Sequence, residues 1–329
     1  MATMCGEIAE RYRPPAAREL PELRAKLGSW LAETGPDFYL ANFLIGRQWL
    51  PGGGSAADGA AAMAGQERRR VTAGDLYWVS AAMTDLVCHA APSLPTWNLY
   101  RHDLPSSLGL MFFEAPLGTY RNSEGREVEI VAASWGPWAG LGGTWPDNGV
   151  WLTFYSHPAP ALPPCAFSAS PRGDLDWVRL AGKLPPVLPD NEAGWPFGEL
   201  DEPPGQIEGT TAQWARMIRA AWLLMRQPLA EQTTEQAPRA ARRRLGRAGH
   251  PVQDVRVIHV RRREHQPTDR SSGDRFREYS CQWWVGGHWR TYWCGPGRRR
   301  PEDRWIAPYL AGPDGKPVRG TERVRVWDR

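Results

Sequence analysis

Apolar residues recur every three to four positions along several stretches of the chain, which is the spacing of an amphipathic α-helix. Leucines repeat in this way from Leu20 to Leu31. Thr72 is a suitable N-cap for a later helix, which Pro92 would end. The pattern predicts helices over residues 16–33, 37–49, 73–91 and 211–227, and a short basic helix between Pro238 and Gly249.

Runs rich in β-branched and aromatic residues, separated by Gly, Asn and Pro, predict β-strands. Those in the first half of the chain follow one another too closely to be joined by crossover helices, so we expect a mainly antiparallel sheet. The predicted strands are 109–117, 126–135 and 149–157, followed near the C-terminus by 254–263, 276–285, 288–294, 303–310 and 322–327.

Two segments show neither the helical spacing nor the strand pattern. Small residues dominate 51–66, which predicts a flexible linker or surface loop, and 158–206 is rich in proline and acids, which predicts an irregular connection. We therefore predict an α+β protein. Its expected parts are N-terminal helices (1–50), the linker (51–66), an α+β domain (67–230), a basic connector (231–250) and a mainly antiparallel β domain (251–329).

Positive charge is concentrated near the C-terminus. Residues 1–235 carry a net charge of −8 and residues 236–329 a net charge of +12, which together give the overall +4. Arginine clusters at 242–244, 261–263 and 298–300 contribute much of the excess. A basic region of this kind is expected where a protein meets a polyanion, so the expected partner is nucleic acid.

Tryptophan is the most unusual feature of the composition, with 18 in 329 residues. The five cysteines are scattered and form no CxxC pair, which argues against a disulfide framework. Apolar runs fall far short of the roughly twenty residues that a membrane helix needs. The N-terminus does not resemble a secretory signal, so we expect a cytoplasmic protein that does not bind membranes.

Tryptophans gather in the sequence WWVGGHWR at 283–290. Two adjacent glycines between strands predict a two-residue hairpin turn at the glycine pair. That register places Trp284 opposite Trp289, and it puts His288 and Arg290 at the rim of the face that we expect to be the core. The facing tryptophans either pack under another part of the chain or stay open for base stacking beside the arginines.

We predict that the C-terminal β domain binds RNA or single-stranded DNA. Arginines would neutralise phosphates and tryptophans would stack on bases, so affinity would fall steeply with salt. A module that binds another protein is an alternative, and its association would tolerate salt. The predicted nucleic-acid-binding residues are Arg261, Arg262, Arg263, Trp284, Trp289, Arg290, Arg298, Arg299 and Arg300.

The sequence leaves open whether the protein is an enzyme. It contains no nucleophile elbow, phosphate-binding loop, zinc-protease helix or dinucleotide-binding motif. A second alternative is a metal-independent ribonuclease, with His288 as general acid or base and Arg290 as a phosphate clamp. Cys281 and Cys294 would share a face with His288, but a structural zinc site usually needs four ligands. We therefore predict neither a metal nor a cofactor.

Two resemblances concern this region. The segments QWWVGGHWRTYW and RWIAPYLAGPDGKPV resemble the tail of uncharacterised proteins from actinobacteria and their plasmids or phages, in which a WVxGHWR hairpin precedes a WIxPYxxGP strand. This resemblance covers about residues 255–329 and implies no particular activity. A Gly-His at a strand start, followed by a second strand with proline, is also similar to ribonuclease toxins of the HicA type. It implies a catalytic role for His288, although Trp289 and Arg290 replace the small or hydroxyl residues usual there.

Overall fold

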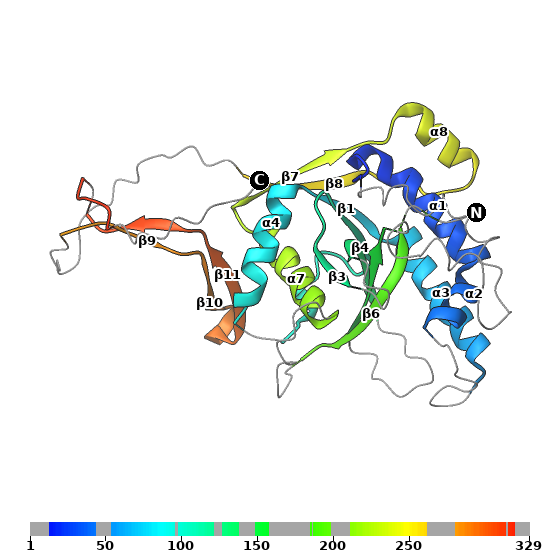
Figure 1. Cartoon of the computed structure of the whole chain (residues 1–329), viewed down its shortest axis with the longest axis horizontal. Helices are drawn as coiled ribbons and strands as arrows, with labels where there is room; N and C mark the ends of the chain where they lie inside the picture. Colours follow the sequence, from blue (N-terminus) through cyan, green and yellow to red (C-terminus); the bar gives the residue numbers. More distant parts are fainter. Residues whose placement is uncertain are drawn as a thin grey trace, which may run out of the picture. The chain divides into compact units, whose positions relative to one another are not determined.

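The fold was obtained as a computed structural model, and the chain forms two compact units, Met1–Val260 (unit 1) and Arg261–Arg329 (unit 2) (Figure 1). Unit 1 combines helices with a mixed sheet and unit 2 contains small antiparallel sheets, which confirms the predicted α+β class. The structure describes residues 13–43, 54–95, 98–121, 127–137, 149–157, 185, 187–198, 211–261, 280–313 and 315–319.

The sheet of unit 1 has eight strands in the order β6-β5-β4-β2-β1-β8-β7, with β3 paired to β4. β1 pairs in parallel with β2 on one side and with β8 on the other, and the remaining ladders of this sheet are antiparallel. The strands are β1 Asp75–Val79, β2 Gly109–Phe113, β3 Gly118–Arg121, β4 Glu127–Pro137, β5 Gly149–Ser156, β6 Leu188–Pro196, β7 Ala230–Glu235 and β8 Val255–Val260.

Helices cover both faces of this sheet (Figure 1). α1, α2 and α3 pack on the face that carries Leu76 and Leu110. On the opposite face, α7 places Trp222 against Trp135 with ring centroids 5.2 Å apart, and α4 packs beside α7. The helices are α1 Leu20–Glu33, α2 Gly35–Asn42, α3 Ala56–Ala73, α4 Ala81–Ala90, α7 Thr211–Leu224 and α8 Arg239–Arg247.

Most of the segment expected to be a linker belongs instead to α3. Ser55 caps this helix, because its Oγ accepts a hydrogen bond from the Asp58 amide at 3.1 Å. Ala60 and Ala64 are buried, and α3 packs against both α1 and α2. A Cβ added at Gly35 of α2 would lie 3.0 Å from the Cβ of Ala64. The small residues thus allow close helix packing and are not a sign of flexibility.

The helix predicted over 73–91 is a strand followed by a shorter helix. β1 ends at Val79, and Ser80 caps α4 by accepting a hydrogen bond from the Met83 amide at 3.4 Å. Leu76 and Tyr77 are both buried because each face of the strand is covered, so the strand lacks the alternation that would have marked it. α4 connects the parallel strands β1 and β2, which the sequence did not predict, whereas the strands predicted at β2, β4 and β5 pair antiparallel without a crossover helix, as expected.

Other boundaries also differ from expectation. α8 follows Pro238 as predicted, and Gly249 beyond its end has a φ of 74°. β6 lies within the segment expected to be irregular, and β7 was not predicted. β8 pairs with β1 in unit 1, so the boundary between the units falls near residue 260 and not near 250. The predicted strand 322–327 lies outside the described residues.

Unit 1 buries a polar network between α3 and the sheet. Arg70 Nε donates to Glu67 Oε2 at 2.8 Å, and the two residues are 3% and 0% exposed. The hydroxyls of Ser134, Thr153 and Tyr155 also donate to the Glu67 carboxylate. These bonds supply the partners that a buried charge requires. The i,i+3 spacing of Glu67 and Arg70 gave no sign of burial, since the same spacing is common on exposed helix faces.

Candidate nucleic-acid interface

The C-terminal strands form one long two-stranded ribbon. β9 pairs with β12 and β10 pairs with β11, both antiparallel. The two ladders have the same offset, because Val285 pairs with Tyr309 and, three residues on, His288 pairs with Ile306. Segments 283–294 and 300–311 therefore run in one continuous register, and we call them the ribbon. Its strands are β9 Trp283–Val285, β10 His288–Cys294, β11 Arg300–Ile306 and β12 Tyr309–Ala311.

The glycine pair lies within the ribbon and not at its turn, so the predicted hairpin register is wrong. Neither glycine has the positive φ that the predicted turn needs. By the register, Gly286 and Gly287 lie opposite Pro308 and Ala307, where the ladder is interrupted. Pro308 has no amide hydrogen to donate there. A Cβ at Gly287 would lie 2.3 Å from Cζ2 of Trp305, so glycine lets this indole approach the backbone closely.

One face of the ribbon is packed around a pair of tryptophans. Trp289 lies opposite Trp305 with ring centroids 5.4 Å apart in an edge-to-face arrangement, and the two residues are 9% and 6% exposed. Trp289 is therefore not available to stack on a base, which corrects its predicted role. The prediction also placed His288 and Arg290 on the side opposite Trp289 but expected that side to be the core, whereas both residues are exposed.

The other face carries the positive charge. Arg290 lies directly opposite Arg304, and the two guanidinium carbons are 5.2 and 5.3 Å from the ring centroid of Tyr292. Trp284, farther along the ribbon, is 68% exposed. We call this the basic face, and in the continuous register its aromatic and basic residues are Trp284, His288, Arg290, Tyr292, Arg300 and Arg304.

Two arginines directly opposite each other cost stability, because like charges repel across strands. Arg304 Nε donates to Glu302 Oε1 at 3.0 Å, and this bond is the main reason that the pKa of Glu302 is lowered. The π face of Tyr292 attracts both guanidinium groups. With the boundary at residue 260, unit 2 contains 16 Lys and Arg against 9 Asp and Glu, a net charge of +7. The site is therefore suited to an anionic ligand.

His288 is exposed at the start of β10, and its Nδ1 lies 3.1 Å from the carbonyl oxygen of Gly286. Its cross-strand neighbour is the apolar Ile306, so no acid or base faces it directly across the ladder. Cys281 and Cys294 are free thiols. In the part of the chain that the structure describes, no group of three or more His, Cys, Asp or Glu side chains could hold a metal ion.

Arginines 298–300 form the exposed tip of the ribbon. The turn there contains Gly295 and Gly297, with φ of 77° and 68°. Arg298 has a φ of 52°, a left-handed conformation that costs a non-glycine residue about 1 kcal/mol or more. The strained position therefore carries a charged side chain where glycine would fit the backbone better.

Replacing Arg298 by glycine should leave unit 2 at least as stable while weakening the binding of an anionic probe, a labelled oligonucleotide, a few-fold. Glycine relieves the left-handed strain, whereas the loss of one cation removes one positive charge available to the phosphates of the probe. Hydrogen exchange of the ribbon amides measures the stability, and anisotropy of a labelled oligonucleotide measures the affinity. The matched control is Arg299→Gly, which removes the same charge at a φ of −99° and should lower stability. Unchanged affinity in both variants would contradict a role for the tip.

Of the three remaining predicted arginines, one lies among the described residues. Arg261 is exposed, whereas Arg262 and Arg263 lie outside the described residues. The sequence interpretation missed Arg304. Alternation along β11 groups Arg304 with Arg290 only once β10 and β11 are recognised as partners.

No protein-family model matches the sequence, and no curated protein matches it significantly. None of the helices in the described ranges is long and apolar enough to cross a membrane. Function is therefore inferred from the geometry and charge of the described residues.

Proposed function

We propose that unit 2 binds single-stranded nucleic acid, RNA or single-stranded DNA, along the basic face of the ribbon. The observation that carries the proposal is the exposed indole of Trp284 on the same face as the opposed pair Arg290 and Arg304. Proteins that bind single strands combine exposed rings, on which bases stack, with positive groups that contact phosphates. Every base has an aromatic face, so we expect little sequence preference.

The length of the ribbon suits an extended ligand. Trp284 and Arg290 are six residues apart, and a strand rises about 3.4 Å per residue, so they are separated by roughly 20 Å. Arg300 lies toward the opposite end of the same face, where it is part of the arginine tip. A single strand of nucleic acid that runs along the basic face would contact one stacking position and then several cations.

Replacing Trp284 by alanine should weaken binding roughly 5- to 150-fold, the effect of losing one stacked base. Anisotropy of fluorescein-labelled oligouridine and oligothymidine, titrated with the full chain at low salt, measures this change. The matched control is Trp293→Ala, since Trp293 is 60% exposed but lies on the opposite face of the ribbon, in the β10–β11 ladder. Equal losses in the two variants, or no binding by the unaltered protein, would overturn the proposal.

Salt separates stacking from charge in the same assay. Arg290→Gln should reduce the slope of log affinity against log salt by about 0.7, the value for one phosphate of a single strand. Trp284→Ala should lower the affinity and leave the slope unchanged. His288→Ala should retain most of the affinity, and cleavage of the RNA that disappears in this variant would favour the ribonuclease alternative. Salt-tolerant association with a protein, without nucleic-acid binding, would favour an interaction module.

A further inference from the structure

α8 carries five arginines and no acidic residue within nine positions, RAARRRLGR. The buried arginines of unit 1 are explained by their partners. Arg24 donates to the Pro251 carbonyl oxygen at 2.7 Å, and Arg219 donates to Asp103 Oδ2 at 3.1 Å. The arginines of α8 are exposed, so the fold of unit 1 does not account for them in this way.

The arginines of α8 lie on the side that faces solvent. Ala241 and Leu245 are the buried residues of the helix. With 3.6 residues per turn, Arg239, Arg243 and Arg247 form a row on the opposite side, with steps of about 6 Å and a total length of about 12 Å. No ion pair joins any of the three to a described residue. Like charges at this spacing repel each other and destabilise the helix.

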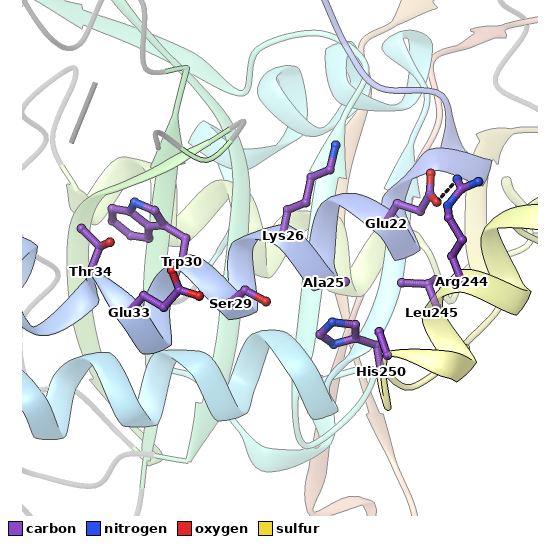
Figure 2. Close-up of a pocket in the computed structure, with 11 residues that line it drawn as sticks. Glu22, Ala25, Lys26, Ser29, Trp30, Glu33, Thr34, Arg244, Leu245 and His250 are labelled. Atoms are coloured by element: carbon purple, nitrogen blue, oxygen red, sulfur yellow. Dashed lines mark hydrogen bonds and ion pairs between the residues drawn. The ribbon is translucent and has the colours of Figure 1, made fainter. Parts of the chain in front are cut away.

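A cavity of about 660 Å³ between α1 and α8 does not account for the row (Figure 2). Arg244 reaches toward this cavity and pairs with Glu22 of α1. Glu33, Lys26 and His250 also line the cavity, so groups of both signs are present there. The excess of positive charge therefore lies on the outer face of α8 and not inside the cavity.

We infer that the outer face of α8, formed by Arg239, Arg242, Arg243 and Arg247, binds the phosphate backbone of double-stranded nucleic acid. This site lies within unit 1, so it adds to the proposed function of unit 2 without depending on it. A DNA duplex carries one negative charge per about 1.7 Å, so a row of about 12 Å spans several phosphates. α8 has no aromatic side chain, so its contacts are to the backbone and independent of sequence.

The chemistry of α8 favours nucleic acid over an anionic membrane. Helices that bind membranes bury an apolar face in the lipid. The apolar face of α8 consists of Ala241 and Leu245, which are 3% and 5% exposed because they already pack in unit 1. α8 therefore offers charge to a ligand but no apolar side chain to a bilayer.

The test replaces Arg239, Arg243 and Arg247 together by glutamine. Glutamine is a good helix former, and the substitution removes repulsion, so the thermal midpoint should stay the same or rise. Anisotropy of a fluorescein-labelled DNA duplex of mixed sequence should show at least about a tenfold loss of affinity at low salt. The slope of log affinity against log salt should decrease by about 0.9 for each phosphate that the variant no longer neutralises.

The matched control removes the same charge elsewhere in unit 1, through Arg18→Gln, Arg68→Gln and Arg69→Gln, three exposed arginines outside α8. It should bind the duplex like the unaltered protein. A second control, Trp284→Ala, should lose affinity for oligouridine and keep its affinity for the duplex, which separates this inference from the proposed function. The inference is overturned if the unaltered protein does not bind the duplex, or if both triple variants lose the same amount of affinity for it. It is also overturned if the protein binds anionic vesicles in preference to the duplex.

Discussion

Replacing Arg70 by methionine should destabilise unit 1 by about 3–5 kcal/mol, the cost of leaving a buried charge without its partner. The substitution removes the guanidinium that neutralises Glu67, and the partners that remain around this carboxylate are the hydroxyls of Ser134, Thr153 and Tyr155. Methionine fills much of the same space, so the loss is mainly electrostatic. Urea unfolding followed by helical circular dichroism measures it, because the α-helices among the described residues all belong to unit 1.

A second substitution in the same pair distinguishes charge from packing. Glu67→Gln added to Arg70→Met should recover much of the lost stability, since the double variant buries no charge at this place. Arg69→Met, on the exposed side of the same helix, should change the free energy of unfolding by less than about 0.5 kcal/mol. A double variant that is less stable than Arg70→Met alone would show that the pair is not the source of the effect.

Stability should also fall by on the order of 3 kcal/mol as the pH rises from about 4.5 to about 7, because of Glu192 on β6. Burial raises the pKa of Glu192 from its ordinary 4.5 to about 7, and the nearby Glu67 also acts to raise it. Between these pH values the folded state holds a proton that the unfolded state releases, so each unit of pH favours unfolding. Above pH 7 the contribution is lost and the dependence levels off.

The contacts of Glu192 agree with a neutral carboxyl. Its Oε1 accepts a hydrogen bond from the Tyr39 hydroxyl at 2.9 Å and lies 3.1 Å from the Thr153 hydroxyl. Thr153 has a single hydroxyl proton and also lies 2.9 Å from Glu67, so it cannot donate to both carboxylates at once. A protonated Glu192 removes this conflict.

Urea titrations of the free energy of unfolding between pH 5 and pH 8 test the role of Glu192. Glu192→Gln should match the unaltered protein at pH 5 and be more stable at pH 8, so the difference between the two isolates this carboxyl from all other groups. Glu127→Gln, an exposed residue of β4, should follow the unaltered protein throughout. A Glu192→Gln variant that is equally destabilised at both pH values would rule out the titration.

The sequence predicts the parts of the fold where local pattern and packing agree. The leucine repeat of α1 marks this helix because it buries one side and exposes the other, whereas α7 is marked by its apolar residues although most of its positions are buried. β1 and α3 lack such a pattern of apolar and polar residues in their sequences, each for a different reason. β1 is covered on both faces, and α3 uses alanine and glycine to approach its neighbours, so the tertiary environment decides each segment.

The sequence indicates several residues of the candidate site but not which strands of the ribbon pair with each other. Trp284 and the arginines of the tip are exposed, and the sequence had left the exposure of Trp284 open. Their neighbours depend on which strands pair, and a Gly-Gly sequence suits both a tight turn and a close approach of an aromatic ring. The ring of Trp305, which comes from the partner strand, decides between the two at Gly287. The polar network around Glu67 could not be predicted, because its members come from elements far apart in the chain.

The interrupted ladder at the glycine pair separates two parts of the proposed binding surface. Trp284 lies on one side of the interruption, and Arg290 and Arg304 lie on the other. Fewer backbone hydrogen bonds link the two strands at this point, so bending there costs less than bending elsewhere along the ribbon. The distance between the exposed ring and the paired cations can then adjust while each half keeps its own pairing. A flexible single strand would thus meet a surface that bends with it, and the number of nucleotides between a stacked base and a neutralised phosphate need not be fixed.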